Sequence, residues 1–179
     1  TLSLAIGIIL FFPSNVNSAQ KILLYKGMFN RPITIQELEL FAKKGIKKGL
    51  IKRIIKKEEE INVKNLLIEK YKAPVELTSR LLYSEIGEVI LKRIAKVMHP
   101  HRIHNESTSM LALKTGTIKA IVIGKDYINI LDFLKAYPSE VIAIDVSELG
   151  KVINKVESMK ELVKFFSDAP LDKLKSEPS

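Results

Sequence analysis

Three histidines close together are the residues whose type and spacing come nearest to a chemical site. His99, His101 and His104 are all the histidines of the chain, and Asn105 and Glu106 follow them directly. Neutral imidazoles bind zinc, nickel and copper, so this cluster could hold one such ion weakly. A firm metal site normally draws a further ligand from a second element, which fixes its geometry. We therefore interpret the segment as a solvated polar loop and keep metal binding as the weaker alternative.

Patterns of catalytic residues are missing from the sequence. Four carboxylates would be candidates for acid–base chemistry: Glu85, Glu88, Asp132 and Asp145. Such chemistry needs two of them on different elements facing one cleft, and each is more simply explained as a cap or a surface charge. The nucleophile elbow Gly-x-Ser-x-Gly, phosphate-binding loops and cysteine do not occur in the 179 residues. We expect no catalytic residue and no cofactor.

The chain is strongly basic, and lysine supplies most of the positive charge. The formal net charge is +9, from 24 lysines and 5 arginines against 20 acidic residues. Lysine is a mobile point charge, so this excess favours diffuse attraction to anionic surfaces over bidentate recognition of phosphate or carboxylate. The scarcity of arginine, together with the export inferred below, argues against nucleic acid as a partner. We expect a protein or an anionic membrane surface instead.

The densest group of cations lies in residues 43–60, which read KKGIKKGLIKRIIKKEEE. Isoleucine and leucine recur there at helical spacing, so the pattern predicts an amphipathic helix with its cations on the outer side. The candidate anionic-surface residues are Lys43, Lys44, Lys47, Lys48, Lys52, Arg53, Lys56 and Lys57. Two interpretations remain open: an ordinary solvated face whose isoleucines pack on the core, or a surface for an anionic membrane or an acidic partner.

An uncharged apolar stretch opens the sequence and indicates export. Residues 2–12 are too short to cross a bilayer as a helix, but they have the length of the apolar region of a secretory signal. Pro13 and a run of small polar residues follow, with cleavage expected after Ser18 or Ala19. We therefore expect residues 1–19 to be a truncated signal peptide.

The remaining chain divides into short elements with clear breaks. A hairpin is expected over residues 21–33, with Gly27 in its turn and residues 30–32 as a second break. Residues 34–37 (TIQE) form a capping box, which starts a helix that Gly45 ends. Further helices are expected over 62–73, 74–98 with a break at 84–87, 107–123, 127–136 and 147–166, and a strand over 140–146.

These elements predict an α+β fold that is mainly α. Six or seven helices would pack with a small sheet made from the hairpin and the strand near 140–146, because these strands are not stable alone. We expect a single helical domain over residues 20–166 and a flexible tail over 167–179. At the helix break, Tyr83 is expected to anchor the junction and Gly87 to permit close helix contact.

Several strings occur in an order that resembles a known family. They are YKGMF at 25–29, LELFAKKG at 38–45, LYSEIGE at 82–88, LKRI at 91–94, ILDFLKAYP at 130–138 and IAIDV at 142–146. Their order resembles the N-terminal region of the cyanobacterial proteins described as alpha/beta hydrolases of unknown function. The likeness covers nearly all of residues 20–166.

The resemblance implies a position after a signal peptide and, in longer members, before a hydrolase domain. Because these residues contain no nucleophile elbow, it implies a stand-alone, non-catalytic accessory domain that binds a protein or lipid partner. The alternative is the detached regulatory or lid half of an alpha/beta hydrolase. The implied destination is the periplasm or the thylakoid lumen. The resemblance gives no support to the histidines as ligands, and the basic run at 43–57 departs from the more neutral stretch expected there.

Overall fold

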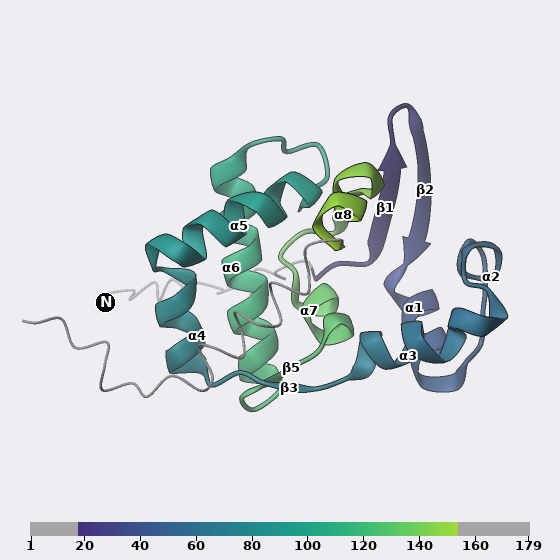
Figure 1. Ribbon diagram of the computed structural model, residues 1–179, viewed down its shortest axis with the longest axis horizontal. Helices are drawn as coiled ribbons and strands as arrows, with labels where there is room; N and C mark the ends of the chain where they lie inside the picture. The colour runs from purple at the N-terminus through teal and green to yellow at the C-terminus, as the bar shows by residue number, and fades with distance from the viewer. Residues whose placement is uncertain (1–17, 154–179) are drawn as a thin grey trace, which may run out of the picture.

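The computed structural model describes residues 18–153, the last four of them by backbone only (Figure 1). Most of the predicted signal peptide, the predicted tail and the last predicted helix beyond residue 153 lie outside the described residues. The described part is an α+β structure that is mainly α, as the sequence predicts. None of its helices combines the length and the hydropathy that crossing a bilayer requires.

A four-stranded mixed sheet brings segments from both ends of the domain together. Its strands are β1 (Lys21–Lys26), β2 (Phe29–Thr34), β4 (Met98–Pro100) and β6 (Val141–Asp145), in the order β2-β1-β6-β4. β1 pairs antiparallel with β2 and parallel with β6, and β6 pairs antiparallel with β4. The predicted sheet of the hairpin and the strand near 140–146 is therefore confirmed, with β4 as an additional member.

The hairpin turns tightly at Gly27, as predicted. Gly27 and Met28 form a two-residue turn, and the φ of 59° at Gly27 is one that glycine adopts without strain. The predicted second break at residues 30–32 is wrong, because β2 continues through it in register with β1. Pro32 is tolerated because β2 is an edge strand, where a missing N–H can face solvent.

Helices cover the sheet and form both ends of the molecule. They are α1 (Ile35–Lys44), α2 (Ile51–Ile54), the 3-10 helix η1 (Lys57–Glu59), α3 (Glu60–Ile68), α4 (Val75–Leu82), α5 (Glu85–Val97), α6 (Glu106–Ile123), α7 (Ile130–Ala136) and α8 (Val146–Ile153). Figure 1 shows α4, α5 and α6 at one end, α1, α2 and α3 at the other, and α7 between them. A second, two-stranded sheet pairs β3 (Tyr71–Lys72) with β5 (Tyr127–Ile128).

Capping residues determine where several helices begin and end. Thr34 and Glu37 form the predicted capping box: the Glu37 N–H donates to Thr34 Oγ1 at 3.1 Å, and the Thr34 N–H donates to the Glu37 carboxylate at 2.9 Å. Gly45 ends α1 in the left-handed conformation, as predicted. Ser84 caps α5 by accepting from the N–H of Gly87, so the predicted break between two helices is confirmed.

The junction between α4 and α5 is closely packed at Gly87. A Cβ at this position would lie 1.8 Å from the carbonyl oxygen of Leu81, so the predicted close contact is confirmed. Tyr83 was expected to anchor this junction, but it is 67% exposed and does not pack inside it. Its ring lies on the surface instead, with the Nζ atom of Lys114 4.2 Å from its centre.

The predicted amphipathic helix over residues 43–60 is wrong. Only α2 and the short η1 form there between α1 and α3, and a loop joins α1 to α2. Gly45 and Gly49 both have positive φ, at 69° and 50°, which a right-handed helix does not contain. Ile55 is extended and ends α2 after one turn. The backbone preference of the two glycines thus outweighs the helical spacing of the isoleucines.

Two further predicted helix boundaries differ from the structure. α3 begins at Glu60, not at Asn62, and ends early enough for β3 to follow. α7 begins after Asn129, whose side chain accepts from the N–H of Asp132 at 2.7 Å. Residues 127–128, predicted as helix, form β5 and pair with β3. A local cap and a distant strand pair decide these boundaries, and hydrophobic periodicity indicates neither.

The core lies against one face of the sheet. Phe41 in α1, Tyr137 after α7 and Ile142 in β6 are fully buried in one cluster, which also includes Ile22 beside Ile142. Side chains alternate along a strand, so Ala143, the next residue of β6, points to the opposite face. That second face carries the candidate site.

Candidate binding site

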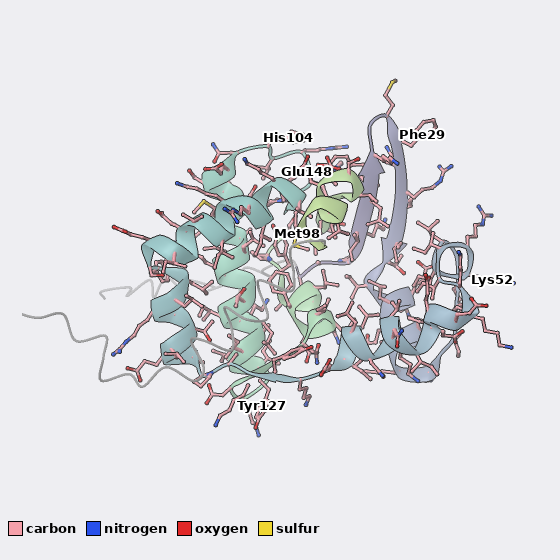
Figure 2. All side chains as sticks on the ribbon, viewed as in Figure 1. Phe29, Lys52, Met98, His104, Tyr127 and Glu148 are labelled. Carbon is pink, nitrogen blue, oxygen red and sulfur yellow. The ribbon has the colours of Figure 1, made fainter. Side chains whose placement is uncertain are left out.

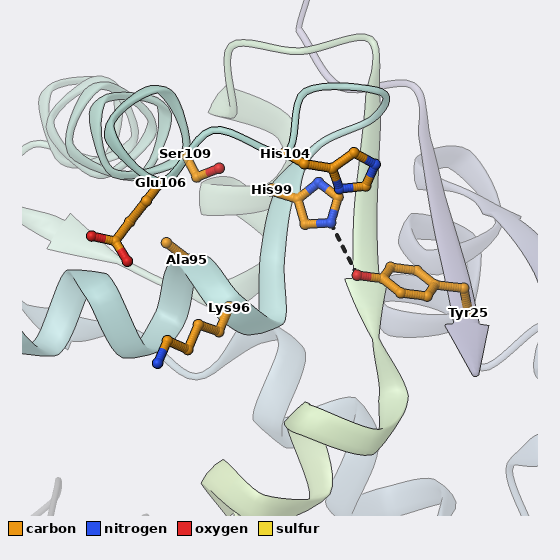
Figure 3. Close-up of a pocket in the computed structure, with 7 residues that line it drawn as sticks. All are labelled: Tyr25, Ala95, Lys96, His99, His104, Glu106 and Ser109. Carbon is orange, nitrogen blue, oxygen red and sulfur yellow. Dashed lines mark hydrogen bonds between the residues drawn. The ribbon is translucent and has the colours of Figure 1, made fainter. Parts of the chain in front are cut away.

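A pocket of about 280 Å³ opens beside β4 (Figure 3). It is formed by β1, α5, β4, the loop before α6 and α6 itself. The lining residues are Tyr25, Ala95, Lys96, His99, His104, Glu106 and Ser109. The fold therefore brings two of the three histidines to one cavity, together with a tyrosine that is distant in the sequence.

His99 reaches this pocket from a strand that the sequence had predicted as polar loop. His99 pairs with Ala143 across β4 and β6, and Tyr25 lies on β1, on the other side of β6. The register places all three side chains on one face of the sheet. The prediction of a loop is wrong at His99, which is 6% exposed, because pairing with β6 satisfies the backbone there.

Both ring nitrogens of His99 have hydrogen-bond partners. Nδ1 lies 3.0 Å from the carbonyl oxygen of Pro100, which can only accept, so Nδ1 carries the proton and donates. Nε2 then accepts from the hydroxyl of Tyr25, also at 3.0 Å. Burial, with the nearby charges of Asp145 and Glu148, raises the pKa of Tyr25 and keeps this hydroxyl protonated as a donor. Neither side chain is left free as a base or a nucleophile.

The fold brings His99 and His104 of the predicted cluster together but leaves His101 out of the pocket. His104 packs beside His99 with ring centres 4.8 Å apart, but the nitrogens of His99 are already used. His101 does not line the pocket, and its backbone N–H donates to the carbonyl of Val141. Over the described residues, no three or more His, Cys, Asp or Glu side chains are arranged to hold an ion. The geometry gives the metal alternative no support.

The other polar groups of the pocket are paired or at its rim. The hydroxyl of the buried Ser109 donates to the carbonyl oxygen of Asn105 at 2.9 Å. This hydrogen bond lies within the first turn of α6. Lys96 and Glu106 are exposed and carry opposite charges. The pocket can therefore offer hydrogen bonds and weak charge contacts to a small polar molecule.

The four candidate carboxylates belong to three different helix starts and take local roles. Asp132 accepts from the side-chain amide of Asn129 at 2.8 Å, beside the cap of α7. Asp145 accepts from the N–H of Ser147 at 2.8 Å and so caps α8. Glu85 and Glu88 are exposed in the first turn of α5. These placements agree with the interpretation as caps and surface charges.

The eight cations of the basic run are spread over several elements. Lys43 and Lys44 end α1, Lys47 and Lys48 lie in the next loop, Lys52 and Arg53 lie in α2, and Lys56 and Lys57 lie at η1. Lys43 forms an ion pair with Glu39 at 2.6 Å, and Lys47 forms one with Glu60 at 2.8 Å. The cations are therefore not one face of one helix, and two of them are paired with carboxylates.

Sequence reasoning did not single out the two most exposed large apolar side chains among the described residues. Met28 is 98% exposed and Phe29 is 76% exposed. Both lie at the turn of the hairpin, and Figure 2 shows Phe29 at its far end. The available signal was Gly27, because a tight turn at this residue places the next two side chains at the tip.

One comparison with known proteins identifies a family. A family model described as "Alpha/beta hydrolase of unknown function (DUF1400)" matches residues 18–145, which contain every strand of the described sheets. The chain belongs to this family. No curated protein matches the chain, and no solved structure does. The sequence of this DUF1400 region contains no nucleophile elbow.

Proposed function

We propose that this DUF1400 domain is a non-catalytic accessory domain that binds a protein or lipid partner after export. The observation that carries the proposal is the hairpin tip, where Met28 is almost fully exposed and Phe29 largely so. Two adjacent large apolar side chains on a projecting turn lose hydrophobic stabilisation in water and regain it on contact with a partner. This favours binding as the role of the hairpin.

The polar pocket supports the non-catalytic part of the proposal. Its buried His99 and Ser109 and its half-buried Tyr25 bond to one another or to backbone carbonyls. A catalytic base or nucleophile needs a free lone pair directed at the substrate, with a pKa suited to the proton transfer. The pairing of His99 and Tyr25 fits a structural link between β1 and β4 better than a reacting group.

Turnover of a broad panel of esters by the purified full chain tests this proposal. The expected rate equals the buffer background for wild type and for Ser109→Ala, which removes the buried serine of the pocket. Hydrolysis that stays with the protein through a second purification would contradict the proposal. Loss of that hydrolysis in Ser109→Ala would place the reaction in the pocket.

Export to the periplasm or thylakoid lumen is a second part of the proposal, and the structure favours one of its two cleavage sites. Ala19 is buried in the core, and the N–H of Gln20 donates to the carbonyl of Glu140 at 2.9 Å. Cleavage after Ser18 would retain both contacts. Sequencing of protein from its native host should therefore begin at Ala19, and an intact N-terminus in the cytosol would contradict export.

A second candidate function is the regulatory or lid half of an alpha/beta hydrolase. The family description favours it, because it names a hydrolase while these residues carry none of the elbow chemistry. A reading frame with a nucleophile elbow beside this one, whose product purifies with this chain, would support it. Hydrolase activity unchanged by adding this chain would count against it.

A further inference from the structure

The tip of the hairpin extends beyond the rest of the sheet. Pairing between β1 and β6 ends at Tyr25 and Asp145, whereas β1 and β2 pair one step further, up to the turn. Met28 and Phe29 lie at this outer end, which Figure 1 shows projecting past α8. The two side chains form a small convex apolar point, not a groove.

The charges carried by the hairpin itself have one sign. The hairpin from Lys21 to Thr34 carries three cations and no carboxylate. Lys26 and Arg31, which flank the tip, are both exposed, and neither forms an ion pair with a described carboxylate. The nearest strand carboxylate, Asp145, lies behind the tip and accepts from the backbone of α8. An anionic surface therefore meets no opposing carboxylate on the hairpin.

The small size of the point distinguishes a membrane from a protein partner. A stable protein interface buries about 800 Å² on each side, across some 20–30 residues. Two side chains on a two-residue turn present far less surface than that. A bilayer interface needs no complementary cavity, because lipids rearrange around an inserted side chain. Aromatic residues prefer this interface, and neighbouring cations are attracted by anionic headgroups.

We propose that the hairpin is a membrane contact whose tip inserts Met28 and Phe29 into the interface of an anionic bilayer, while Lys26 and Arg31 bind its headgroups. This inference rests on the proposed binding function and names lipid as the partner. Insertion is shallow, because the outward-facing backbone groups of edge strand β2 remain at the depth of the headgroups, where water still satisfies them. The binding weakens with salt, since screening shortens the range of the cations.

A tryptophan at the tip reports this insertion directly, because the natural chain has none. Phe29→Trp is compared with Tyr127→Trp, which Figure 2 shows at the opposite end of the molecule. The probes are vesicles of phosphatidylcholine alone and of phosphatidylcholine mixed with phosphatidylglycerol. This local readout is needed because the apolar residues 2–12 of the full chain could bind vesicles themselves.

The proposal expects a blue shift and quenching by lipid-borne quenchers for Phe29→Trp only, on the anionic vesicles, and reduced by salt. Equal signals from both tryptophans, no signal from Phe29→Trp, or a signal of equal size on neutral vesicles would overturn it. A protein partner, or insertion by residues 2–12 alone, gives one of these contradicting results.

Paired substitutions in the wild-type chain separate the two contributions. Met28→Ser with Phe29→Ser should weaken anionic vesicle binding by about tenfold or more, while Leu111→Ser with Val122→Ser, two exposed apolar side chains of α6, should not. Lys26→Gln with Arg31→Gln should weaken it by about fivefold for each cation, and Lys92→Gln with Arg93→Gln on α5 by much less.

Equal losses in a pair and its control would overturn the proposal. Loss restricted to Lys48→Gln with Lys52→Gln would do so as well, by assigning the contact to the basic run. Esterase turnover, which would contradict the proposed function, leaves these vesicle results unaffected, so the two can fail separately.

Discussion

His99 and Tyr25 connect two strands that do not pair with each other. Their hydrogen bond crosses β6 from β4 to β1, and the second bond of His99 goes to the backbone of its own strand. A buried donor or acceptor that loses its partner costs more than the bond itself contributes, because the remaining group stays desolvated. The pair therefore stabilises the sheet by joining β4 to β1, in addition to lining the pocket.

Replacing Tyr25 with Phe tests this link. The variant leaves Nε2 of His99 without its donor, and we expect the free energy of unfolding to fall by about 1–2 kcal/mol. Urea unfolding at neutral pH measures the change. Tyr71→Phe, which removes an exposed hydroxyl bonded to Glu69, is the matched control and should change little. A Tyr25 variant as stable as wild type would show that water replaces the hydroxyl.

Tyr137 presents the opposite case. It is fully buried, burial raises the pKa of its hydroxyl, and that oxygen has no hydrogen-bond partner among the described residues. Tyr137→Phe removes the unsatisfied group and keeps the ring that packs edge-on against Phe133. We expect the free energy of unfolding to rise by about 1 kcal/mol, measured by urea unfolding. A decrease would reveal a partner outside the described residues or a bound water.

Chemical roles were the part of the site that the sequence could least predict. The histidines were visible as a cluster, but the partner that defines His99 is Tyr25, which lies 74 positions away in the sequence. Nothing local indicates that β1 and β4 flank the same strand. Asp145, which caps α8, and Asp132, which bonds to the cap of α7, in contrast act within three residues, and for that reason a local interpretation described them well.

At the scale of elements, the close packing of α4 against α5 requires glycine at position 87. A Cβ on Gly87 would overlap the carbonyl of Leu81, which is backbone and cannot rotate away. Gly87→Ala should therefore lower the free energy of unfolding by about 3 kcal/mol, as in overpacked cores. Thermal unfolding beside Glu88→Ala, an exposed control in the same helix, measures the effect. A loss no larger than that of the control would mean that the two helices can separate.

An ion pair between elements makes a small part of the stability dependent on pH. Glu39 of α1 accepts from Lys43 and from Lys135 of α7, and these hydrogen bonds lower the pKa of its carboxyl. Because the pKa is lower in the folded state, the charged carboxylate stabilises the fold at pH values above the unfolded-state pKa. This stabilisation is lost as the pH falls through the folded-state pKa. Glu39→Gln should then cost at most about 1 kcal/mol at pH 7, since the site is partly exposed.

This difference from wild type should shrink as the pH falls below the ordinary pKa of a glutamate and disappear once the pH is below the lowered pKa of folded Glu39, where the carboxyl is protonated in both states. Urea unfolding at a series of pH values measures it. Glu76→Gln, which removes an exposed pair within α4 alone, provides the comparison and should have a smaller effect. A constant difference across the series would contradict a role for the charge of Glu39.

Elements with a local signal were predictable, and those with a distant one were not. The capping box at Thr34, the turn at Gly27 and the break at Ser84 each act over a few residues and were correct. The predicted helix over 43–60 is wrong because Gly45 and Gly49 adopt a left-handed conformation, which hydrophobic periodicity does not indicate. β3, β4 and β5 are two or three residues long, too short to carry a pattern, and exist because of their partners.

At the scale of the whole molecule, the sheet fixes the arrangement. β6 lies between β1 and β4 and pairs with both, so residues near the end of the described chain complete a surface that begins with its first strand. The mainly α class and the presence of a small sheet follow from composition and spacing. Strand order does not, because pairing over more than a hundred residues leaves no local trace.

For the whole molecule, we propose that the DUF1400 domain binds through the hairpin tip and does not catalyse a reaction in the pocket. Exposure of the purified chain to a fluorophosphonate tests that claim most directly, because an activated serine of a hydrolase displaces fluoride and keeps the phosphonyl group. We predict that the intact mass of the protein stays unchanged after prolonged exposure. A stoichiometric adduct on any serine would contradict the account.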